Sequence, residues 1–355
     1  MTNKKIIFTG GGTAGHVTPN LALIKKFQQQ NWDVVYIGSQ TGIEKEIIAK
    51  INIPYYAITT GKLRRYFSLQ NFIDPIKIFF GIFQSIVLIY KLKPKVVFSK
   101  GGFVAFPVVV AAWLKRIPAV IHESDLTIGL TNKLCLPFAR KICFTFPSTA
   151  LQIKNKNKAV LTGTPIREDF LNGDANQGRQ LCGFANNKKI ILAFGGSLGA
   201  DVINKNMRKI LPEILTDFNV IHICGPGRVD DNCNYIGYKQ FEYLHADFAH
   251  ILAAADLVIS RAGANSVYEL IMAKKPNILI PLAAKSSRGD QIVNAQYCAR
   301  NSYSELILQE DLTSEILLEK IYTVEKNSDK IIKNMHAFKA LDSTEIIYSL
   351  ITALS

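Results

Sequence analysis

A histidine, a glutamate and a glutamine in this sequence each stand beside a glycine-containing segment, where a folded chain can bring them to a ligand. His16 directly follows the turn Gly10–Gly15, while Glu269 and Gln291 lie in the segments RAGANSVYE and SSRGDQIVNA. A neutral imidazole can accept a hydroxyl proton near neutral pH, and the positive end of a helix helps to keep it neutral. His16 is therefore a candidate base or anion contact; the alternative is a residue that packs or caps its helix.

Glu269 and Gln291 have the functional groups that recognise sugars. Glu269 is expected about one and a half turns into a helix that follows the strand Leu257–Ser260. A carboxylate there can accept hydrogen bonds from both ribose hydroxyl groups, although a solvated helix charge is the alternative. Asp290 and Gln291 offer polar side chains to the hydroxyl groups of a sugar.

Two glycine turns open similar segments of the chain. KKIIFTGGGTAG (4–15) aligns without a gap with KKIILAFGGSLG (188–199). A glycine turn between a strand and a helix admits a ligand close to the backbone and leaves helix N–H groups free to bind an anion. The repeat favours two similar α/β domains, although α/β proteins reuse this turn often enough for a chance match.

The first turn satisfies the pattern G-x-G-x-x-G, which alone is weak. A dinucleotide site would also need an acidic residue at the end of the second strand, and that strand ends YIGSQ (36–40) without one. Hydride transfer is therefore disfavoured. A P-loop is excluded because no G-K-[ST] follows the turn.

Short apolar runs separated by helix-length segments indicate parallel strands that are covered on both faces. The sequence thus predicts an α/β protein of two Rossmann-like, doubly wound parallel-sheet domains, with ligands at the carboxyl ends of the strands. The expected strands are 6–9, 34–38, 96–99, 119–122, 142–146, 159–162, 190–194, 220–224, 257–260 and 277–281.

Composition narrows the class of partner. The 355 residues carry 42 Lys+Arg and 28 Asp+Glu, a net charge of +14. This charge attracts nucleic acid, anionic lipid or a phosphorylated substrate, or simply marks a basic surface. Six cysteines without a C-x-x-C pair argue against a zinc site or a disulfide framework and fit a reducing cytosol. The N-terminus reads as a first strand, not as a signal peptide.

The stretch 72–90 is nearly apolar on all sides. Asp74, Pro75 and Lys77 interrupt it, so we do not expect a transmembrane segment. A buried crossover helix and an interfacial helix that touches lipid are the two alternatives.

Seven motifs then occur in order across most of the chain, and together they are highly specific. They closely resemble the MurG family of peptidoglycan N-acetylglucosaminyltransferases, within glycosyltransferase family 28. The motifs are GGGTAGHVTPN (10–20), GGFVAFP (101–107), HESD with GLTNK (122–133), TGTPIR (162–167), GGSLGA (195–200), RAGANSVYE (261–269) and SSRGDQIVNA (286–295).

The resemblance implies a GT-B fold with a cleft between the domains. It implies inverting transfer of N-acetylglucosamine from UDP-GlcNAc to undecaprenyl-diphospho-N-acetylmuramoyl-pentapeptide, the step from lipid I to lipid II in cell-wall synthesis. No metal or other cofactor and no nucleic acid is expected. Residues 1–165 would bind the acceptor and the membrane, residues 166–340 would bind the donor, and a helix in 341–355 would cross back to the first domain.

The resemblance also assigns roles to individual residues. His16 would take part in catalysis and acceptor binding. The donor contacts would be Thr13, Ala14, Gly15, Asp125, Arg167, Ser197, Ala264, Glu269 and Gln291. Many relatives read HEQN where this chain reads HESD (122–125). Asp125 therefore replaces an amide with an anion, which can only accept hydrogen bonds.

A lipid-linked acceptor implies peripheral binding to the anionic cytoplasmic face of the cell membrane. Cations mixed with aromatic residues are the expected surface: Arg64, Arg65, Phe79, Phe83, Trp113 and Lys141. Three rival functions can be distinguished by assays. A diacylglycerol glucosyltransferase would use another acceptor, a dehydrogenase would bind NAD(H), and a nucleotide-sugar sensor would bind UDP-GlcNAc without releasing UDP.

Overall fold

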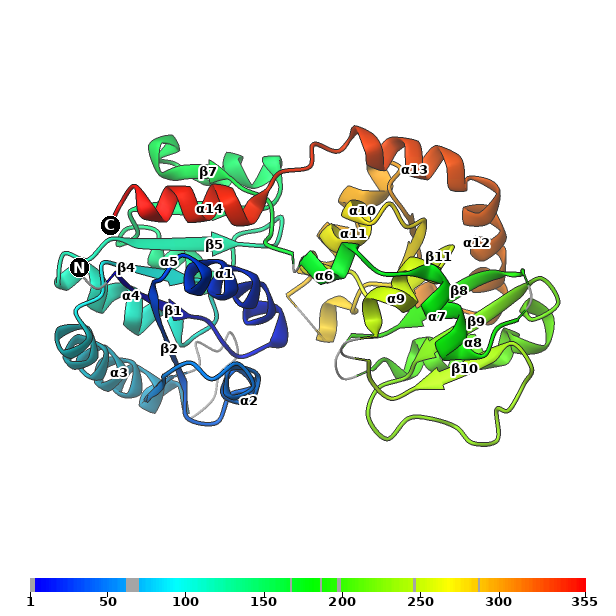
Figure 1. Cartoon of the computed structure of the whole chain (residues 1–355), viewed down its shortest axis with the longest axis horizontal. Coiled ribbons are helices and arrows are strands. Elements are labelled where there is room, and N and C mark those ends of the chain that lie inside the picture. Colours follow the sequence, from blue (N-terminus) through cyan, green and yellow to red (C-terminus); the bar gives the residue numbers. More distant parts are fainter. Residues whose placement is uncertain are drawn as a thin grey trace. The chain divides into compact units, whose positions relative to one another are not determined.

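The chain folds into two compact units, each built on one parallel sheet (Figure 1). Unit 1 comprises residues 1–167 and 341–355, and unit 2 comprises residues 168–340. The computed structural model describes residues 4–61, 70–166, 168–185, 187–196, 199–244, 247–286 and 288–355. The division at 167/168 lies two residues beyond the limit expected from the sequence.

The sheet of unit 1 has the strand order β3-β2-β1-β4-β5-β6-β7, with every neighbouring pair parallel. The strands are β1 (Lys5–Thr9), β2 (Asp33–Ser39), β3 (Tyr55–Ile58), β4 (Val96–Ser99), β5 (Ala119–Glu123), β6 (Lys141–Phe144) and β7 (Ala159–Leu161). The connecting helices are α1 (Thr18–Gln29), α2 (Ile43–Ala49), α3 (Gln70–Leu92), α4 (Ala105–Leu114) and α5 (Leu130–Cys135). Short 3-10 turns are η1 (Ala14–His16), η2 (Pro147–Gln152) and η3 (Lys156–Lys158).

Both faces of this sheet are buried, as the apolar runs predicted. On β1, Ile7 packs with residues of α3 and α4, whereas Ile6 and Phe8 pack with residues of α1 on the opposite face. Successive side chains of a strand point to opposite faces, so a central strand covered on both sides is apolar throughout.

The sheet of unit 2 has the order β10-β9-β8-β11-β12-β13, again parallel. Its strands are β8 (Lys189–Phe194), β9 (Phe218–Ile223), β10 (Tyr238–Phe241), β11 (Leu257–Ser260), β12 (Asn277–Leu279) and β13 (Glu305–Leu306). Its helices are α6 (Glu168–Leu171), α7 (Ala175–Cys182), α8 (Asp201–Ile214), α9 (Phe248–Ala254), α10 (Ala264–Met272), α11 (Asp290–Arg300), α12 (Ser314–Lys326) and α13 (Ser328–Ala337), with 3-10 turns η4 (Ala284–Ser286) and η5 (Gln309–Asp311).

Counted from their first strands, the two sheets share the Rossmann order 3-2-1-4-5-6. The aligned segments 4–15 and 188–199 contain β1 and β8, which hold the same central place in the two sheets. The internal repeat read from the sequence therefore corresponds to a repeated fold.

Helix α14 (Ser343–Thr352), the last of the chain, belongs to unit 1. Its Ile347 and Ile351 are fully buried in the core around α1. The amine of Lys26 on α1 lies 2.7 Å from the carboxylate of Glu345. The tail thus returns to the first unit, as the family resemblance implied.

All ten predicted strands are present, with ends shifted by at most two residues. The structure adds β3, β10 and β13, which form edges of the two sheets. Their side chains are partly exposed, so their sequences lack the continuous apolar runs that mark central strands.

Candidate functional site

Several predicted site residues lie near the two places where a strand order reverses: residues 13–16 follow β1, and Ala264 and Glu269 follow β11. In unit 1 the reversal lies between β1 and β4, and in unit 2 between β8 and β11. Doubly wound sheets bind ligands beyond the carboxyl ends of the strands at such a switch point. The first glycine turn follows β1, and the second follows β8. We describe each switch point by itself.

At the first switch point, His16 ends the short turn η1 and precedes α1, which begins at Thr18. The His16 N–H donates to the Thr13 carbonyl over 3.1 Å, and the Thr18 hydroxyl donates to the Ala14 carbonyl over 3.0 Å. His16 is half-buried, while Thr13 and Gly15 are exposed. The turn thus presents the residues 13–16 near the start of a helix.

A buried carboxylate, which the sequence reading missed, fills the back of this turn. Glu44 on α2 is fully buried and accepts hydrogen bonds from the Gly12 N–H (3.2 Å) and from the Ser39 N–H (3.0 Å). The Ser39 hydroxyl also donates to it. A Cβ on Gly11 would lie 2.6 Å from this carboxylate. Glu44 therefore occupies an N–H group that an anion would otherwise bind.

Glu44 also bears on whether the first glycine turn could bind a dinucleotide. Strand β2 ends without an acidic residue, as predicted, but α2 brings a carboxylate back to that end. Since this carboxylate is buried and bonded to the turn itself, it is not placed to accept the hydroxyl groups of a ribose.

The segment after β4 completes the first switch point. Lys100 is only 2% exposed, and Gly101 and Gly102 both have positive φ. The Gly11 N–H donates to the Gly101 carbonyl over 3.3 Å, and a Cβ on Gly102 would collide with the Gly11 carbonyl. The loops after β1 and β4 therefore pack in direct contact.

Asp125 lies beyond the end of β5 in this unit and is 9% exposed. Its N–H donates to the carboxylate of Glu123 over 3.1 Å. The Gly129 N–H and the Asn132 amide donate to the other Glu123 oxygen over 2.8 and 3.0 Å. Burial and the charge of Asp125 raise the pKa of Glu123. The carboxyl groups of Glu123 and Asp125 thus belong to one largely buried segment.

The second switch point is more open. A Cβ on Gly196 would have no atom of the described residues within 4 Å, although its φ of +89° favours glycine. The Gly199 N–H donates to the Gly196 carbonyl over 3.0 Å, and the 14-residue helix α8 starts just beyond, at Asp201. Ser197 lies outside the described residues.

The loop after β11 brings two predicted donor contacts to this point. Ala264 is the first residue of α10 and is buried, and Glu269 lies five residues further along the helix and is half-buried. A Cβ on Gly263 would have none of the described atoms within 4 Å. Arg261 donates to the carbonyls of Ile280 (3.1 Å) and Pro281 (3.2 Å), which ties this loop to the one after β12.

Gln291, in the first turn of α11, is held beside the same loops. Its side-chain oxygen accepts a hydrogen bond from the Leu282 N–H over 3.1 Å. Asn294, one turn later, donates to the Ala262 carbonyl over 3.1 Å. The loops after β11 and β12 therefore meet at α11, which places Ala264 and Gln291 on elements at one end of the sheet. Arg167 lies outside the described residues.

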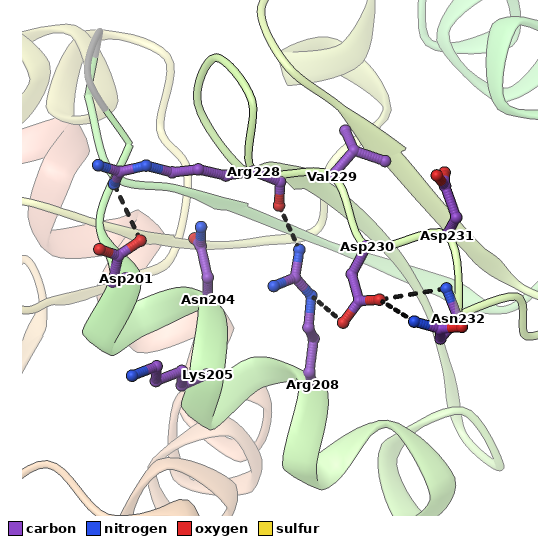
Figure 2. A pocket seen from close by; sticks show the side chains of 9 residues that line it. All are labelled: Asp201, Asn204, Lys205, Arg208, Arg228, Val229, Asp230, Asp231 and Asn232. Atoms are coloured by element: carbon purple, nitrogen blue, oxygen red, sulfur yellow. Dashed lines mark hydrogen bonds and ion pairs between the residues drawn. The ribbon is translucent and has the colours of Figure 1, made fainter.

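Unit 2 also contains a cavity of about 460 Å³ beside α8 (Figure 2). Arg228 forms an ion pair with Asp201 (3.1 Å), and Arg208 lies 4.0 Å from Asp230. The described residues that line it are Asp201, Asn204, Lys205, Arg208, Arg228, Val229, Asp230, Asp231 and Asn232. Three basic and three acidic residues of this lining balance one another, and none of the predicted donor contacts that the structure describes is among them.

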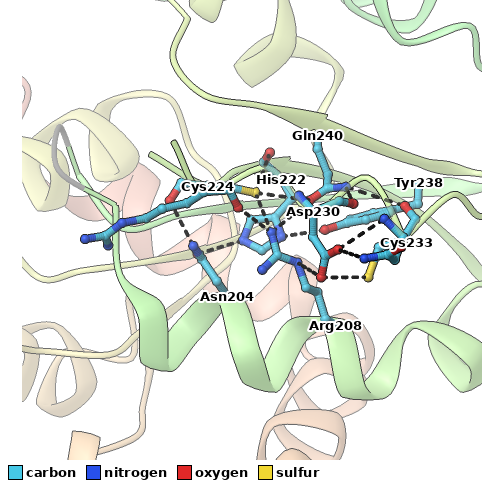
Figure 3. A network of polar contacts seen from close by, with 10 residues as sticks. Asn204, Arg208, His222, Cys224, Asp230, Cys233, Tyr238 and Gln240 are labelled. Carbon is cyan, nitrogen blue, oxygen red and sulfur yellow. Dashed lines mark hydrogen bonds and ion pairs between the residues drawn. The ribbon is translucent and has the colours of Figure 1, made fainter. Parts of the chain in front are cut away.

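Next to this cavity, a polar network joins α8 to β9 and β10 (Figure 3). His222 is fully buried between the Tyr238 hydroxyl (2.8 Å) and the Asn204 side-chain oxygen (3.0 Å). Since an amide oxygen only accepts, Nε2 of His222 carries the hydrogen and Nδ1 accepts from Tyr238. Burial, with a smaller effect of Arg208, lowers the pKa of His222 to about 3. The network ties three elements together with a neutral ring.

An apolar surface of unit 1 lies on α3 and α4, which pack against each other. Phe79 and Phe83 are 70% and 61% exposed, and Trp113 is 52% exposed. The amine of Lys115 lies 5.6 Å from the ring centre of the exposed Tyr90. We call Phe79, Phe80, Phe83, Tyr90 and Trp113 the aromatic surface.

Helix α3 joins β3 to β4 as a crossover helix, with Ser85 and Ile89 buried and an exposed outer face. By length and composition alone, its residues Asp74–Leu92 would suffice to cross a membrane. The Lys141 amine donates to the Asn157 carbonyl over 2.8 Å. Arg64 and Arg65 lie outside the described residues.

Comparison with known proteins gives two family matches. Residues 6–144 match the glycosyltransferase family 28 N-terminal domain, and residues 190–350 match the family's C-terminal domain. A protein of Clostridium perfringens (strain ATCC 13124) is 54% identical over 340 residues, which cover 96% of this chain and 95% of that protein. One of Geobacillus kaustophilus (strain HTA426) is 51% identical over 350 residues, which cover 98% of each chain. Both are named UDP-N-acetylglucosamine–N-acetylmuramyl-(pentapeptide) pyrophosphoryl-undecaprenol N-acetylglucosamine transferase.

Among solved structures, MurG of Acinetobacter baumannii is similar over 99% of both chains, with a TM-score of 0.79 and 27% identity. The predicted GT-B fold class is thereby confirmed. A UDP-N-acetylglucosamine 2-epimerase also matches, with a TM-score of 0.64 over 96% of this chain and 92% of that one, but at 14% identity. The fold therefore does not by itself separate transfer from other chemistry.

Proposed function

The chain belongs to glycosyltransferase family 28, and we propose that it transfers N-acetylglucosamine from UDP-GlcNAc to an undecaprenyl-diphosphate-linked N-acetylmuramoyl-pentapeptide. The observation that carries this proposal is identity above 50% over nearly the whole length of relatives named for that reaction. The seven ordered motifs include the segments that hold His16, Glu269 and Gln291.

The two switch points support a division of labour. The second is open at Gly196 and Gly263 and lies at the start of α8, so it suits the diphosphate and sugar of the donor. The first is already filled by Glu44, which repels an anion, and it presents His16 at its rim. Unit 1 accordingly takes the acceptor hydroxyl and some contacts to the transferred sugar, and unit 2 takes most of UDP-GlcNAc.

The reaction is a single displacement that inverts the anomeric carbon. A hydroxyl oxygen of the muramoyl sugar attacks this carbon, the bond from the carbon to the UDP oxygen breaks, and His16 accepts the hydroxyl proton. Glu269 holds the ribose hydroxyl groups and Gln291 the hydroxyl groups of the transferred sugar. Thr13, Ala14, Gly15 and Asp125 complete the sugar contacts.

The departing UDP gains negative charge, which Arg167, the turn at Ser197 and the N-terminus of α8 stabilise in place of a metal ion. No metal is required in this proposal. Activity should therefore persist after dialysis against EDTA, and a loss that Mg²⁺ or Mn²⁺ restores would contradict it.

The enzyme works as a peripheral protein at the cytoplasmic face of the cell membrane, where its acceptor lies. The aromatic surface of α3 and α4 supplies apolar contact, and neighbouring cations such as Lys115 supply attraction to anionic lipid at about 1 kcal/mol each. Flotation with vesicles of anionic lipid should show binding that weakens as salt rises. Binding that depends neither on lipid charge nor on salt concentration would contradict an electrostatic contribution to membrane binding.

The deciding experiment measures UDP release from UDP-GlcNAc with and without the lipid-linked muramoyl-pentapeptide. We expect rapid release only when this acceptor is present, with N-acetylglucosamine found on the acceptor by mass spectrometry. A diacylglycerol acceptor and UDP-glucose serve as controls. Release that is equally fast without the muramoyl acceptor, or preference for diacylglycerol, would contradict the proposal.

A further inference from the structure

A tyrosine hydroxyl group is buried beside the turn that carries His16, and neither the motifs nor the proposed reaction uses it. Tyr36 on β2 pairs with Phe8 on β1, and its side chain is fully buried in the core around α1. The Tyr36 hydroxyl donates to the Gly10 carbonyl over 2.8 Å. A phenylalanine would fill the same core space without burying a polar atom. The hydroxyl group therefore adds a contact to the turn, and the ring supplies the packing.

The donor and the acceptor of this contact are fixed. The Gly10 carbonyl can only accept, so the Tyr36 hydroxyl donates. Burial raises the pKa of Tyr36, which keeps the proton on the hydroxyl oxygen. The side-chain amide of Asn20 on α1 donates to the same oxygen over 3.3 Å. Tyr36 thus joins the first residue of the turn to the helix that follows it.

The same Asn20 amide lies beside the last residue of the turn. Asn20 is fully buried, and its amide nitrogen lies 3.5 Å from the His16 carbonyl oxygen. The backbone of Gly10 also approaches this oxygen, because a Cβ on Gly10 would lie 2.7 Å from it. The two ends of the segment 10–16 therefore meet beside the Tyr36 hydroxyl.

Glu44 holds the middle of the segment, where its carboxylate accepts from the Gly12 N–H over 3.2 Å. The backbone that leads to His16 is thus bonded at Gly10, at Gly12 and at His16 itself. A group that accepts a proton must lie close to its productive position, since a misplacement of about 1 Å can cost about 10²-fold in rate. Contacts that fix this backbone therefore bear on the rate of proton transfer.

We propose that Tyr36 is a positioning residue for glycosyl transfer, whose hydroxyl group fixes the turn 10–16 and thereby the place of the His16 ring. The inference rests on the proposed function, because His16 accepts the proton of the acceptor hydroxyl in that reaction. Tyr36 itself is buried and contacts no substrate.

The test is Tyr36→Phe, which removes one oxygen atom and keeps the ring. The kcat for transfer to the muramoyl acceptor should fall about tenfold, because the turn loses its contact at Gly10. The KM for UDP-GlcNAc should stay within about twofold, since most of the donor is assigned to unit 2. An unchanged kcat, or a loss confined to KM, would overturn the proposal.

Tyr55→Phe is the matched control. Tyr55 on β3 stacks on Tyr36 with ring centroids 6.0 Å apart, and its hydroxyl donates to the Ser39 carbonyl at the end of β2 over 2.6 Å. Each substitution removes one hydroxyl group from one backbone carbonyl, so both should lower the melting temperature. Only Tyr36→Phe should lower kcat, because only that hydroxyl group contacts the turn 10–16. Equal losses of kcat in the two variants would contradict the inference.

A double-mutant cycle with His16→Ala shows whether Tyr36 acts through His16. In the His16→Ala background, Tyr36→Phe should change the residual turnover by less than about twofold, because the ring that the turn positions is gone. A tenfold loss in both backgrounds would mean that Tyr36 acts by another route, and the proposal would fail.

A readout without acceptor keeps the inference distinct from the proposed function. In protein labelled with ¹⁵N in its six histidine rings, His16→Ala identifies the His16 signals by their loss. Tyr36→Phe should shift these signals, and Tyr55→Phe should leave them in place. His16 signals that do not move in Tyr36→Phe would overturn the positioning role, whatever the acceptor is. If they shift but the muramoyl acceptor is inert in the native enzyme, the proposed function fails and the positioning of His16 stands.

Discussion

The two switch points of this chain have the same topology and opposite interiors. In unit 1, Glu44 bonds to the glycine turn after β1, and Lys100 is buried after β4. In unit 2, no described atom lies within 4 Å of a Cβ on Gly196 or Gly263, and the described hydrogen bonds of Arg261 after β11 tie neighbouring loops together. The same fold thus builds one turn that is filled by the protein and one that a ligand can fill. The difference is made by side chains that the glycine motifs do not contain.

The largest effect is expected from His16, at the edge of the first switch point, which Glu44 fills. His16→Ala should lower turnover by about 10²- to 10⁴-fold, because it removes the group that accepts the acceptor's proton. Affinity for UDP should stay nearly unchanged, since the donor is assigned to unit 2. Steady-state kinetics and calorimetry with UDP measure the two parts. Full turnover in the variant would show that another group is the base.

The contact between the two loops of unit 1 is tested by Gly102→Ala. The added Cβ would collide with the Gly11 carbonyl at a φ of +80°, so we expect a loss of unfolding free energy on the order of 3 kcal/mol. Chemical denaturation measures this loss.

Gly263→Ala is the matched substitution in unit 2. There φ is −64° and no described atom lies within 4 Å of the added Cβ, so the unfolding free energy should change by less than about 1 kcal/mol. If the donor binds in this space, the added methyl group should also raise the KM for UDP-GlcNAc. Equal destabilisation by both substitutions would remove the contrast between the filled and the open switch point.

Much of this contrast could not be read from the sequence. The apolar runs predicted every central strand, because burial on both faces leaves a strong signal, and the repeat at 4–15 and 188–199 predicted both turns. The edge strands β3, β10 and β13 were missed because half-exposed strands carry mixed residues.

Glu44 and Lys100 were missed for a different reason. Each is a charged residue in an ordinary local sequence, and only tertiary contacts bury it: Glu44 with the turn 32 residues earlier, and Lys100 with His122, 22 residues later. His16, Glu269 and Gln291 were found because they adjoin glycine-containing motifs. Their chemistry suggested their roles, the family resemblance made these roles specific, and the roles remain predictions.

Glu44→Ala should empty the back of the first turn. It leaves the N–H groups of Gly12 and Ser39 without their buried acceptor, so we expect a loss of about 2–3 kcal/mol of unfolding free energy. Glu44→Gln keeps the shape and one acceptor oxygen and should cost less. Thermal and chemical denaturation of the two variants give the comparison. Identical losses would mean that the shape and the single acceptor oxygen kept by glutamine do not hold the turn, and that the intact carboxylate is needed.

The smallest effect concerns the pH dependence of stability. Lys100 has a folded-state pKa of about 7, below its ordinary value near 10.5, so above pH 7 the unfolded chain binds a proton that the folded chain lacks. Unfolding free energy therefore rises with pH in this window, by about 1 kcal/mol between pH 7 and pH 8 relative to Lys100→Met. Subtracting the Lys100→Met curve removes titrations that both proteins share. The His122 ring contacts this amine, and the charges that act on it are those of Glu123, Cys143 and Asp125, with Glu123 the strongest, so Lys100→Met in a Glu123→Gln background separates the strongest coupling. A difference that stays flat from pH 6 to pH 9 would mean that the amine keeps its proton, and the filled switch point would then hold a permanent cation.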